Sequence, residues 1–202
     1  MEEPRTKRPI FTPIVLILLT FSLIGNVFLY SETIQNDQTD RVSQGTEIIQ
    51  SGNAAIAFMN QAAAQTEALV TASDIAARMT SKSGLLAAYR QSGSVTDFIQ
   101  EAEDVNGKPF PTAKGGATEF LDQTLASLQA IGNHEGPLTA EEKTYLQGLH
   151  QVFDACKKEL SAFQHDTINQ EQSLLILVDK QWPQIAGKLL EQMKPADHAF
   201  KG

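Results

Sequence analysis

The chain has 202 residues, of which 20% are charged, and a formal net charge of −8 at pH 7. This acidic balance argues against binding to nucleic acid or to anionic lipid headgroups, because both need clustered positive charge. The single cysteine, Cys156, excludes an internal disulfide framework, so a hydrophobic core must hold the fold together.

The N-terminal region carries the clearest pattern in the chain. Residues Ile10 to Tyr30 include no charged side chain, and three basic residues precede them: Arg5, Lys7 and Arg8. As a helix, a run of about 21 residues is about 31 Å long, which matches the hydrocarbon core of a bilayer. We therefore predict that Ile10 to Tyr30 is a transmembrane anchor, with the lipid bilayer as its partner.

A cleaved secretory signal is the alternative, because its apolar core gives a similar pattern. Such cores are usually about 7 to 15 residues long, with small residues one and three places before the cut. Cleavage after Gly25 would place Leu23 three residues before the cut, and cleavage after Ser31 would place Leu29 there. Both fit poorly, so the sequence favours an uncleaved anchor and leaves open whether a minority of chains is cleaved.

Charge predicts the orientation of this anchor. After Tyr30 the chain contains 13 Lys and Arg residues and 22 Asp and Glu residues, a formal charge of −9. Positive residues flanking a transmembrane helix stay on the cytoplasmic side. We expect residues 1–9 to be a cytoplasmic tail and the larger C-terminal part to lie outside the cytoplasm.

The part after the anchor is predicted to be all-α and to begin with one long helix. Two heptad positions are apolar: Val42, Ile49, Ile56, Ala63, Val70 and Ala77, and Ile48, Ala55, Ala62, Leu69 and Ala76. A third is mostly small: Gly45, Gly52, Met59, Thr66, Ser73 and Thr80. This period predicts a helix from the anchor to about Thr80, with 31–50 as a stalk and 51–202 as the folded domain. The small residues fit close packing within one chain or a seam between two copies equally well.

Further helices are predicted downstream of this first one. A short helix is expected over Ser94–Asp104, followed by an irregular connection at 105–116 that is rich in Gly and Pro. Another is expected from Phe120 to Ile131, with Gly132 as its terminator. Thr139 and Glu142 have capping-box spacing and begin a helix that reaches about Phe163. Its predicted seam is Leu146, Leu149, Phe153, Cys156, Leu160 and Phe163.

The last helix is predicted from about Asn169 to Met193. Proline inside a helix removes a hydrogen bond and clashes with the preceding turn, so Pro183 should bend it between Asp179 and Pro183. The apolar spacing nevertheless continues across the proline, through Leu175, Val178, Trp182, Ile185 and Leu189. With four main helices and short later connections, we expect an antiparallel bundle with Trp182 in its core.

No residue is predicted to be catalytic, cofactor-binding or metal-binding. Cys156 lies in an apolar seam, which favours a buried thiol over a nucleophile. The four histidines lack a common spacing that would bring them to one metal: His134, His150, His165 and His198. His150 and Asp154 are four residues apart and are predicted to form a solvated pair on a helix surface. The acidic residues Glu101, Glu103 and Asp104 near Gly107 do not match a calcium loop, and Gly115–Gly116 lacks the lysine of a phosphate loop.

The anchor followed by a long phased helix resembles the outer portion of bacterial single-pass envelope proteins and, more loosely, the helical sensor modules of chemoreceptors. Sensors return through the membrane, whereas the longest later apolar run, Leu174 to Val178, is too short to span it. We therefore expect a non-enzymatic envelope or assembly accessory that acts on a protein partner or as a homo-oligomer. The alternative is a small-ligand sensing or capture module that works through another membrane protein.

Overall fold

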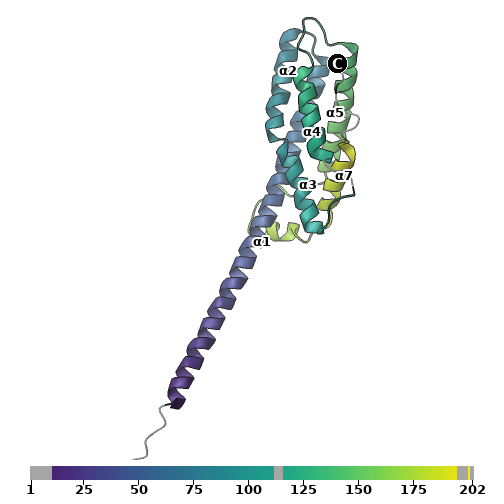
Figure 1. The fold of residues 1–202 in the computed structure, drawn as a ribbon. Coiled ribbons are helices and arrows are strands. Elements are labelled where there is room, and N and C mark those ends of the chain that lie inside the picture. The colour runs from purple at the N-terminus through teal and green to yellow at the C-terminus, as the bar shows by residue number, and fades with distance from the viewer. Residues whose placement is uncertain (1–10, 112–115, 195–199, 201–202) are drawn as a thin grey trace, which may run out of the picture. The chain divides into compact units, whose positions relative to one another are not determined.

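The computed structural model describes residues 11–111, 116–194 and 200, and all their regular elements are helices (Figure 1). In chain order they are α1 (Phe11–Thr71), α2 (Ile75–Ala88), the 3-10 helix η1 (Tyr89–Gln91), α3 (Gly93–Asn106), α4 (Gly116–Ala130), α5 (Ala140–Leu160), α6 (Gln170–Ile176) and α7 (Trp182–Gln192). The chain divides into two compact units, Met1–Ser43 and Gln44–Gly202. The all-helical prediction is confirmed. The predicted tail, residues 1–9, lies outside the described residues.

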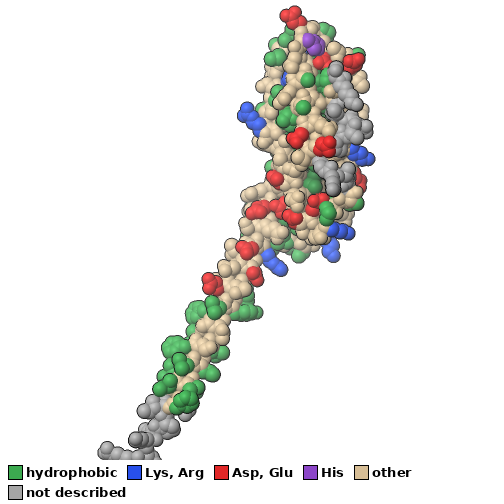
Figure 2. Space-filling model, viewed as in Figure 1, with side chains coloured by type: hydrophobic (Ala, Val, Ile, Leu, Met, Phe, Trp, Pro, Cys, Tyr) green, Lys and Arg blue, Asp and Glu red, His purple; other side chains and the backbone are tan. Residues whose placement is uncertain are grey.

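The first unit contains the apolar part of α1. Its hydrophobic side chains are exposed and cover the surface of the helix, and acidic side chains follow them along the chain (Figure 2). Within this apolar run the Thr20 hydroxyl donates to the Leu16 carbonyl at 2.8 Å, so its polar group is satisfied inside the helix. In the part of the chain that the structure describes, this is the one helix long and apolar enough to cross a membrane.

In the second unit, the remaining part of α1 is a core helix. The predicted seam is buried at Ile48, Ile49, Ala55, Ala62, Ala63 and Leu69. The small third position is buried as well, from Gly45 to Thr66. Because the unit begins at Gln44 and Ile48 is fully buried, its first turns overlap the segment that the sequence predicts as a stalk.

Two glycines of α1 mark close approaches to other parts of the same unit. A Cβ built on Gly45 would lie 1.7 Å from the backbone oxygen of Ser173, and one on Gly52 would lie 2.6 Å from the Phe163 ring. Beside Gly45, the hydroxyls of Thr46 and Ser173 are 2.9 Å apart. Packing within one chain therefore accounts for both glycines.

The first helix ends earlier than predicted. α1 stops at Thr71, and α2 begins at Ile75 after a short turn, so the predicted continuation to about Thr80 is wrong. The Asp74 carboxylate accepts from the Ala77 N–H at 2.8 Å and caps the N-terminus of α2. This cap supplies a partner for a free N–H group at the start of α2. It therefore stabilises the break between α1 and α2, although the apolar period continues across that break.

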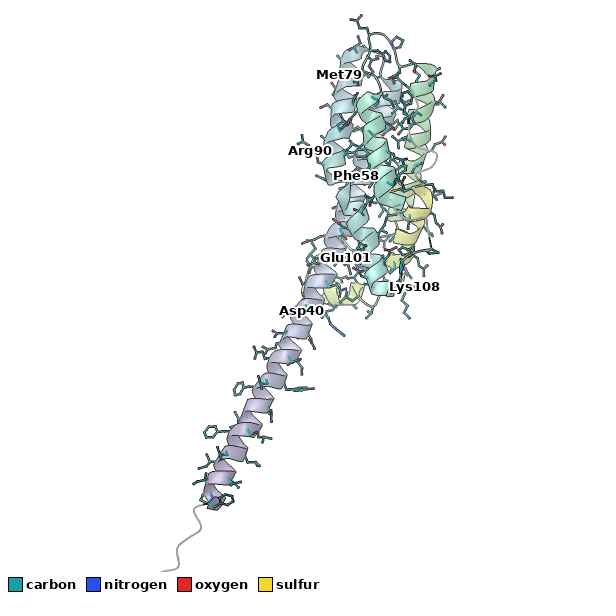
Figure 3. All side chains as sticks on the ribbon, viewed as in Figure 1. Asp40, Phe58, Met79, Arg90, Glu101 and Lys108 are labelled. Carbon is teal, nitrogen blue, oxygen red and sulfur yellow. The ribbon has the colours of Figure 1, made fainter. Side chains whose placement is uncertain are left out.

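Aromatic rings from four elements meet in the middle of the core. Phe58 of α1 lies edge-to-face with Tyr89 at a centroid distance of 5.4 Å and with Phe153 at 6.2 Å, and Phe120 contacts Phe153 at 6.4 Å. Phe58 is labelled near the middle of the compact unit in Figure 3. The predicted seam of α5, from Leu146 to Phe163, is buried throughout.

Several predicted helix ends are confirmed. The capping box of α5 is present, with the Thr139 hydroxyl accepting from the Glu142 N–H at 3.1 Å. α4 ends at Ala130, and Gly132 has a φ of 70°, a left-handed conformation that glycine adopts without strain. The predicted helix over Ser94–Asp104 is α3.

The last helical region is not one bent helix. α6 ends at Ile176 and α7 begins at Trp182, so the predicted continuous helix is wrong. Pro183 lies in the first turn of α7, where its missing N–H needs no partner. Trp182 is 1% exposed and donates from Nε1 to the Ile176 carbonyl at 2.9 Å, which confirms its place in the core. Val178, predicted to be in the seam, is 73% exposed.

We expect Gly45→Ala to lower the free energy of unfolding by about 2 kcal/mol, because the new methyl group meets backbone rather than a side chain that can rotate away. Gly148→Ala is the matched control: a Cβ there has no neighbour within 4 Å, so better helix propensity should stabilise by up to about 1 kcal/mol. Urea unfolding of the detergent-solubilised chain measures both. Equal stabilisation by the two substitutions would contradict the close approach at Gly45.

Candidate functional site

Cys156 is buried, as predicted from its place in an apolar seam. Its side chain is fully buried in the core. Burial raises the pKa of its thiol to about 12, and the nearby Glu159 adds to this effect. The thiolate that nucleophilic chemistry requires is therefore strongly disfavoured.

The three described histidines, His134, His150 and His165, have different hydrogen-bond partners. His150 Nδ1 lies 3.2 Å from the Ala63 carbonyl, so its ring faces α1 instead of forming the predicted solvated pair with Asp154. His165 Nε2 lies 3.2 Å from the Asp179 carboxylate. His198 is outside the described residues. In the described part of the chain, no three His, Cys, Asp or Glu side chains are arranged to hold a metal ion.

The acidic residues near Gly107 have structural contacts. Glu103 Oε1 accepts from the Phe110 N–H at 2.8 Å and so fixes the chain after α3. Burial raises the pKa of Glu101, and the charges of Glu47, Asp104 and Asp97 raise it further. Figure 3 labels Glu101 on α3. Gly115 lies outside the described residues, and Gly116 is the first residue of α4.

Sequence reasoning missed a polar cluster at the α1–α2 end of the compact unit, formed by Arg78, Lys82, His134 and Glu142. Arg78 and Lys82 come from α2 and are 4% and 9% exposed. Arg78 donates to the carbonyls of Gly136 and His134, the latter at 2.6 Å. Lys82 Nζ donates to the carbonyls of Gln129 and Ile131 and to Asn133 Oδ1, at 2.6–3.0 Å.

Glu142 is the anionic member of this cluster. Its carboxylate accepts from Gly132 N at 2.7 Å, from Thr139 N at 2.9 Å and from His134 Nε2 at 2.8 Å. Burial acts to raise the pKa of Glu142, but these hydrogen bonds outweigh it and lower the pKa to about 2. The bond to Glu142 also raises the pKa of His134. Four side chains thus fix the connection between α4 and α5.

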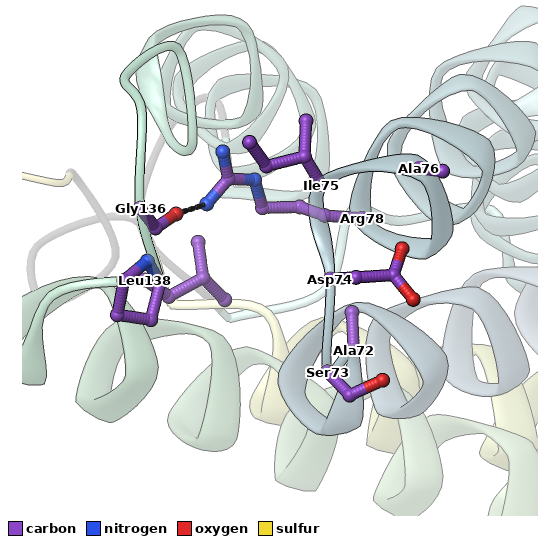
Figure 4. Close-up of a pocket in the computed structure, with 9 residues that line it drawn as sticks. Ala72, Ser73, Asp74, Ile75, Ala76, Arg78, Gly136 and Leu138 are labelled. Carbon is purple, nitrogen blue, oxygen red and sulfur yellow. Dashed lines mark hydrogen bonds between the residues drawn. The ribbon is translucent and has the colours of Figure 1, made fainter.

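A cavity of about 730 Å³ adjoins this cluster (Figure 4). It lies between the α1–α2 turn and the segment 136–138, and Arg78 crosses from one side to the other. Its remaining walls are mainly apolar: Ala72, Ile75, Ala76, Pro137 and Leu138. Of these wall residues Ile75 is 50% exposed, and Met79, one turn farther along α2, is 58% exposed.

A second cavity, of about 600 Å³, lies near the break between α6 and α7. Its lining includes Phe110, Val178, Lys180 and Pro183. Figure 3 places Met79 and Lys108, which follows α3, at opposite ends of the compact unit. Val178, in the lining of this cavity, is exposed, and so is Leu175 of α6.

The sequence offered only weak signals for the polar cluster. Arg78 and Lys82 are four residues apart on a helix, a spacing that ordinarily describes a solvated face. Their burial depends on the carbonyls of the α4–α5 connection, which no local pattern reveals. Glu142 was identified as a capping residue, but its bonds to Gly132 and His134 depend on the tertiary fold.

We expect Cys156→Ala to cost on the order of 1 kcal/mol through lost burial, and Cys156→Asp considerably more, because the new carboxylate would be buried without a partner. Thermal unfolding measures both changes. Alkylation of native Cys156 should be slow and should follow global unfolding. Rapid labelling of the folded chain would contradict the burial.

Removing the Glu142 carboxylate should loosen the α4–α5 connection. Glu142→Gln should cost about 1–3 kcal/mol near pH 7, because it weakens three hydrogen bonds to a buried charge, whereas the exposed neighbour Glu141→Gln should change little. A carboxyl group whose pKa is lower in the folded chain than in the unfolded chain stabilises the fold at pH values above its unfolded pKa. This contribution is lost as the pH falls through the folded pKa. The difference between wild type and Glu142→Gln should therefore shrink from about pH 4.5 to pH 2 in urea unfolding. A difference independent of pH would contradict this role.

No protein-family model matches the chain, and neither the curated proteins nor the solved structures include a significant match.

Proposed function

We propose that this protein is a single-pass, membrane-anchored helical module that acts through protein interaction as a cell-envelope or assembly accessory. The observation that carries this proposal is the composition of α1. One helix contains both the exposed apolar run and the buried core residues from Ile48 to Leu69. The proposed anchor and the core residues therefore belong to one helix, with no separate linker segment between them in the sequence.

The proposed orientation rests on charge. Arg5, Lys7 and Arg8 precede the apolar run, and a strongly acidic region follows it. The N-terminus is then cytoplasmic, and the unit from Gln44 onward is an antiparallel bundle displayed outside the cytoplasm.

Exposed apolar side chains support the interaction role. Ile75 and Met79 are exposed one turn apart on α2, beside the first cavity, and the exposed Val178 lines the second cavity. Side chains of this kind that gather beside a hollow are typical of interaction sites. The acidic surface favours a partner with complementary positive charge.

A second candidate function is small-ligand capture for another membrane protein. The cavity beside Arg78 favours it, because binding pockets combine apolar walls with a few polar groups.

Cysteine labelling on intact cells tests the orientation. In a Cys156→Ala background, a cysteine replacing the exposed Lys143 should react with a membrane-impermeant thiol reagent, while one replacing Thr6 should react only after lysis. The reverse pattern would contradict the proposed topology. Recovery of the chain free in the medium would contradict the anchor.

Site-specific photo-crosslinking tests the interaction role. A photoreactive residue at Met79 or Val178 should give a discrete protein adduct in membranes, and one at the exposed Thr144 of α5 should not. Introducing Ile75→Asp should remove the Met79 adduct, because the charge disrupts an apolar contact. The absence of an adduct at both positions would contradict the interaction role.

A further inference from the structure

The cavity beside Arg78 differs from an ordinary surface hollow in its electrostatics. Two buried cations, Arg78 and Lys82, lie near a single buried carboxylate, that of Glu142. All three are at most 9% exposed. Buried charges are ordinarily paired with opposite charges. Here two cations face one carboxylate, so this end of an acidic chain holds an excess of buried positive charge.

The carboxylate does not neutralise Arg78 directly. Glu142 accepts from Gly132, Thr139 and His134, whereas the hydrogen bonds of Arg78 go to the carbonyls of His134 and Gly136. Lys82 is also held by uncharged oxygen atoms. When His134 is protonated, the local excess of positive charge increases.

The guanidinium of Arg78 also has unused donor capacity. Its Nε is buried and has no hydrogen-bond partner among the described residues. Guanidinium has five N–H donors, and a carboxylate matches the fork formed by two of them. Asp74 does not fill this role, because its carboxylate caps Ala77 and points away from Arg78 in Figure 4.

The walls of the cavity indicate what the rest of a ligand should be. The side chains of Ala72, Ile75, Ala76, Pro137 and Leu138 are apolar and lie within the same hollow as Arg78. A volume of about 730 Å³ falls within the range of ordinary small-molecule pockets. An apolar body with one anionic group is complementary to both features.

We propose that this cavity binds a small organic carboxylate, with its apolar body against Ile75 and Leu138 and its carboxylate on the guanidinium of Arg78. Entry of the carboxylate replaces the His134 carbonyl at Nη2, which lies on the same side of the guanidinium as Nε–H, and brings an acceptor to Nε. This inference rests on the second candidate function, small-ligand capture, for which it names the ligand class, and it does not depend on membrane anchoring.

Isothermal titration of the full chain in nanodiscs, with empty nanodiscs as the blank, tests the proposal. The probes are 4-phenylbutyrate, its neutral counterpart 4-phenylbutanamide, and acetate. The carboxylate should bind at least about tenfold more tightly than the amide, because its hydrogen bonds are charge-assisted. Acetate should bind weakly for lack of an apolar body. In NMR spectra, the Arg78 Nε–H signal should shift with 4-phenylbutyrate and not with the amide.

Two variants separate recognition from folding. Arg78→Gln should abolish the preference for the carboxylate. Ala76→Phe fills the cavity from an exposed position, so it should weaken the binding of 4-phenylbutyrate at least about tenfold. Ala87 is exposed on the same helix but outside the cavity, so Ala87→Phe should leave this binding unchanged. Equal binding of the carboxylate and the amide, or equal binding by the two Phe variants, would overturn the proposal. So would the absence of 4-phenylbutyrate binding up to about 10 mM.

Discussion

The structure of the compact unit depends on how closely the second part of α1 is packed. Gly45 lets the backbone of Ser173 approach to a distance at which a Cβ would clash, and Gly52 leaves room for the ring of Phe163. Those contacts bring the region before α7 and the end of α5 against α1, and the Phe58 cluster fills the space between helices farther along. With no disulfide to restrain it, the fold relies on this packing.

Polar interactions organise the part of the unit that packing leaves open. The connection from α4 to α5 is irregular, and several of its carbonyl and N–H groups bond to side chains instead of to helical backbone. Arg78 and Lys82 bind the carbonyls, and Glu142 binds the N–H groups, so charged side chains provide what regular structure would otherwise supply. This arrangement leaves an excess of positive charge next to the apolar cavity beside Arg78. That combination is the reason for proposing a carboxylate ligand there.

The sequence predicted the features that depend on local pattern. The helical class, the buried seam of α1, the capping box at Thr139 and the burial of Cys156 follow from periodicity and short-range hydrogen bonding, and all are present. The breaks before α2 and α7 were missed because the apolar spacing continues across them. At each break a specific hydrogen bond stabilises the interruption of the helix. Asp74 caps α2, and the Trp182 indole donates to the carbonyl at the end of α6. The Arg78 cluster was missed because its partners are distant in sequence.

The central claim is that one helix is both a membrane anchor and part of the core. Hydrogen exchange of the full chain in nanodiscs tests it most directly, because core amides exchange only by large-scale unfolding. Amides from Ile48 to Leu69 should exchange as slowly as those of α5, with both groups released together as denaturant is added. Fast exchange of these α1 amides while α5 stays protected would show that α1 is not part of the core and would contradict the account.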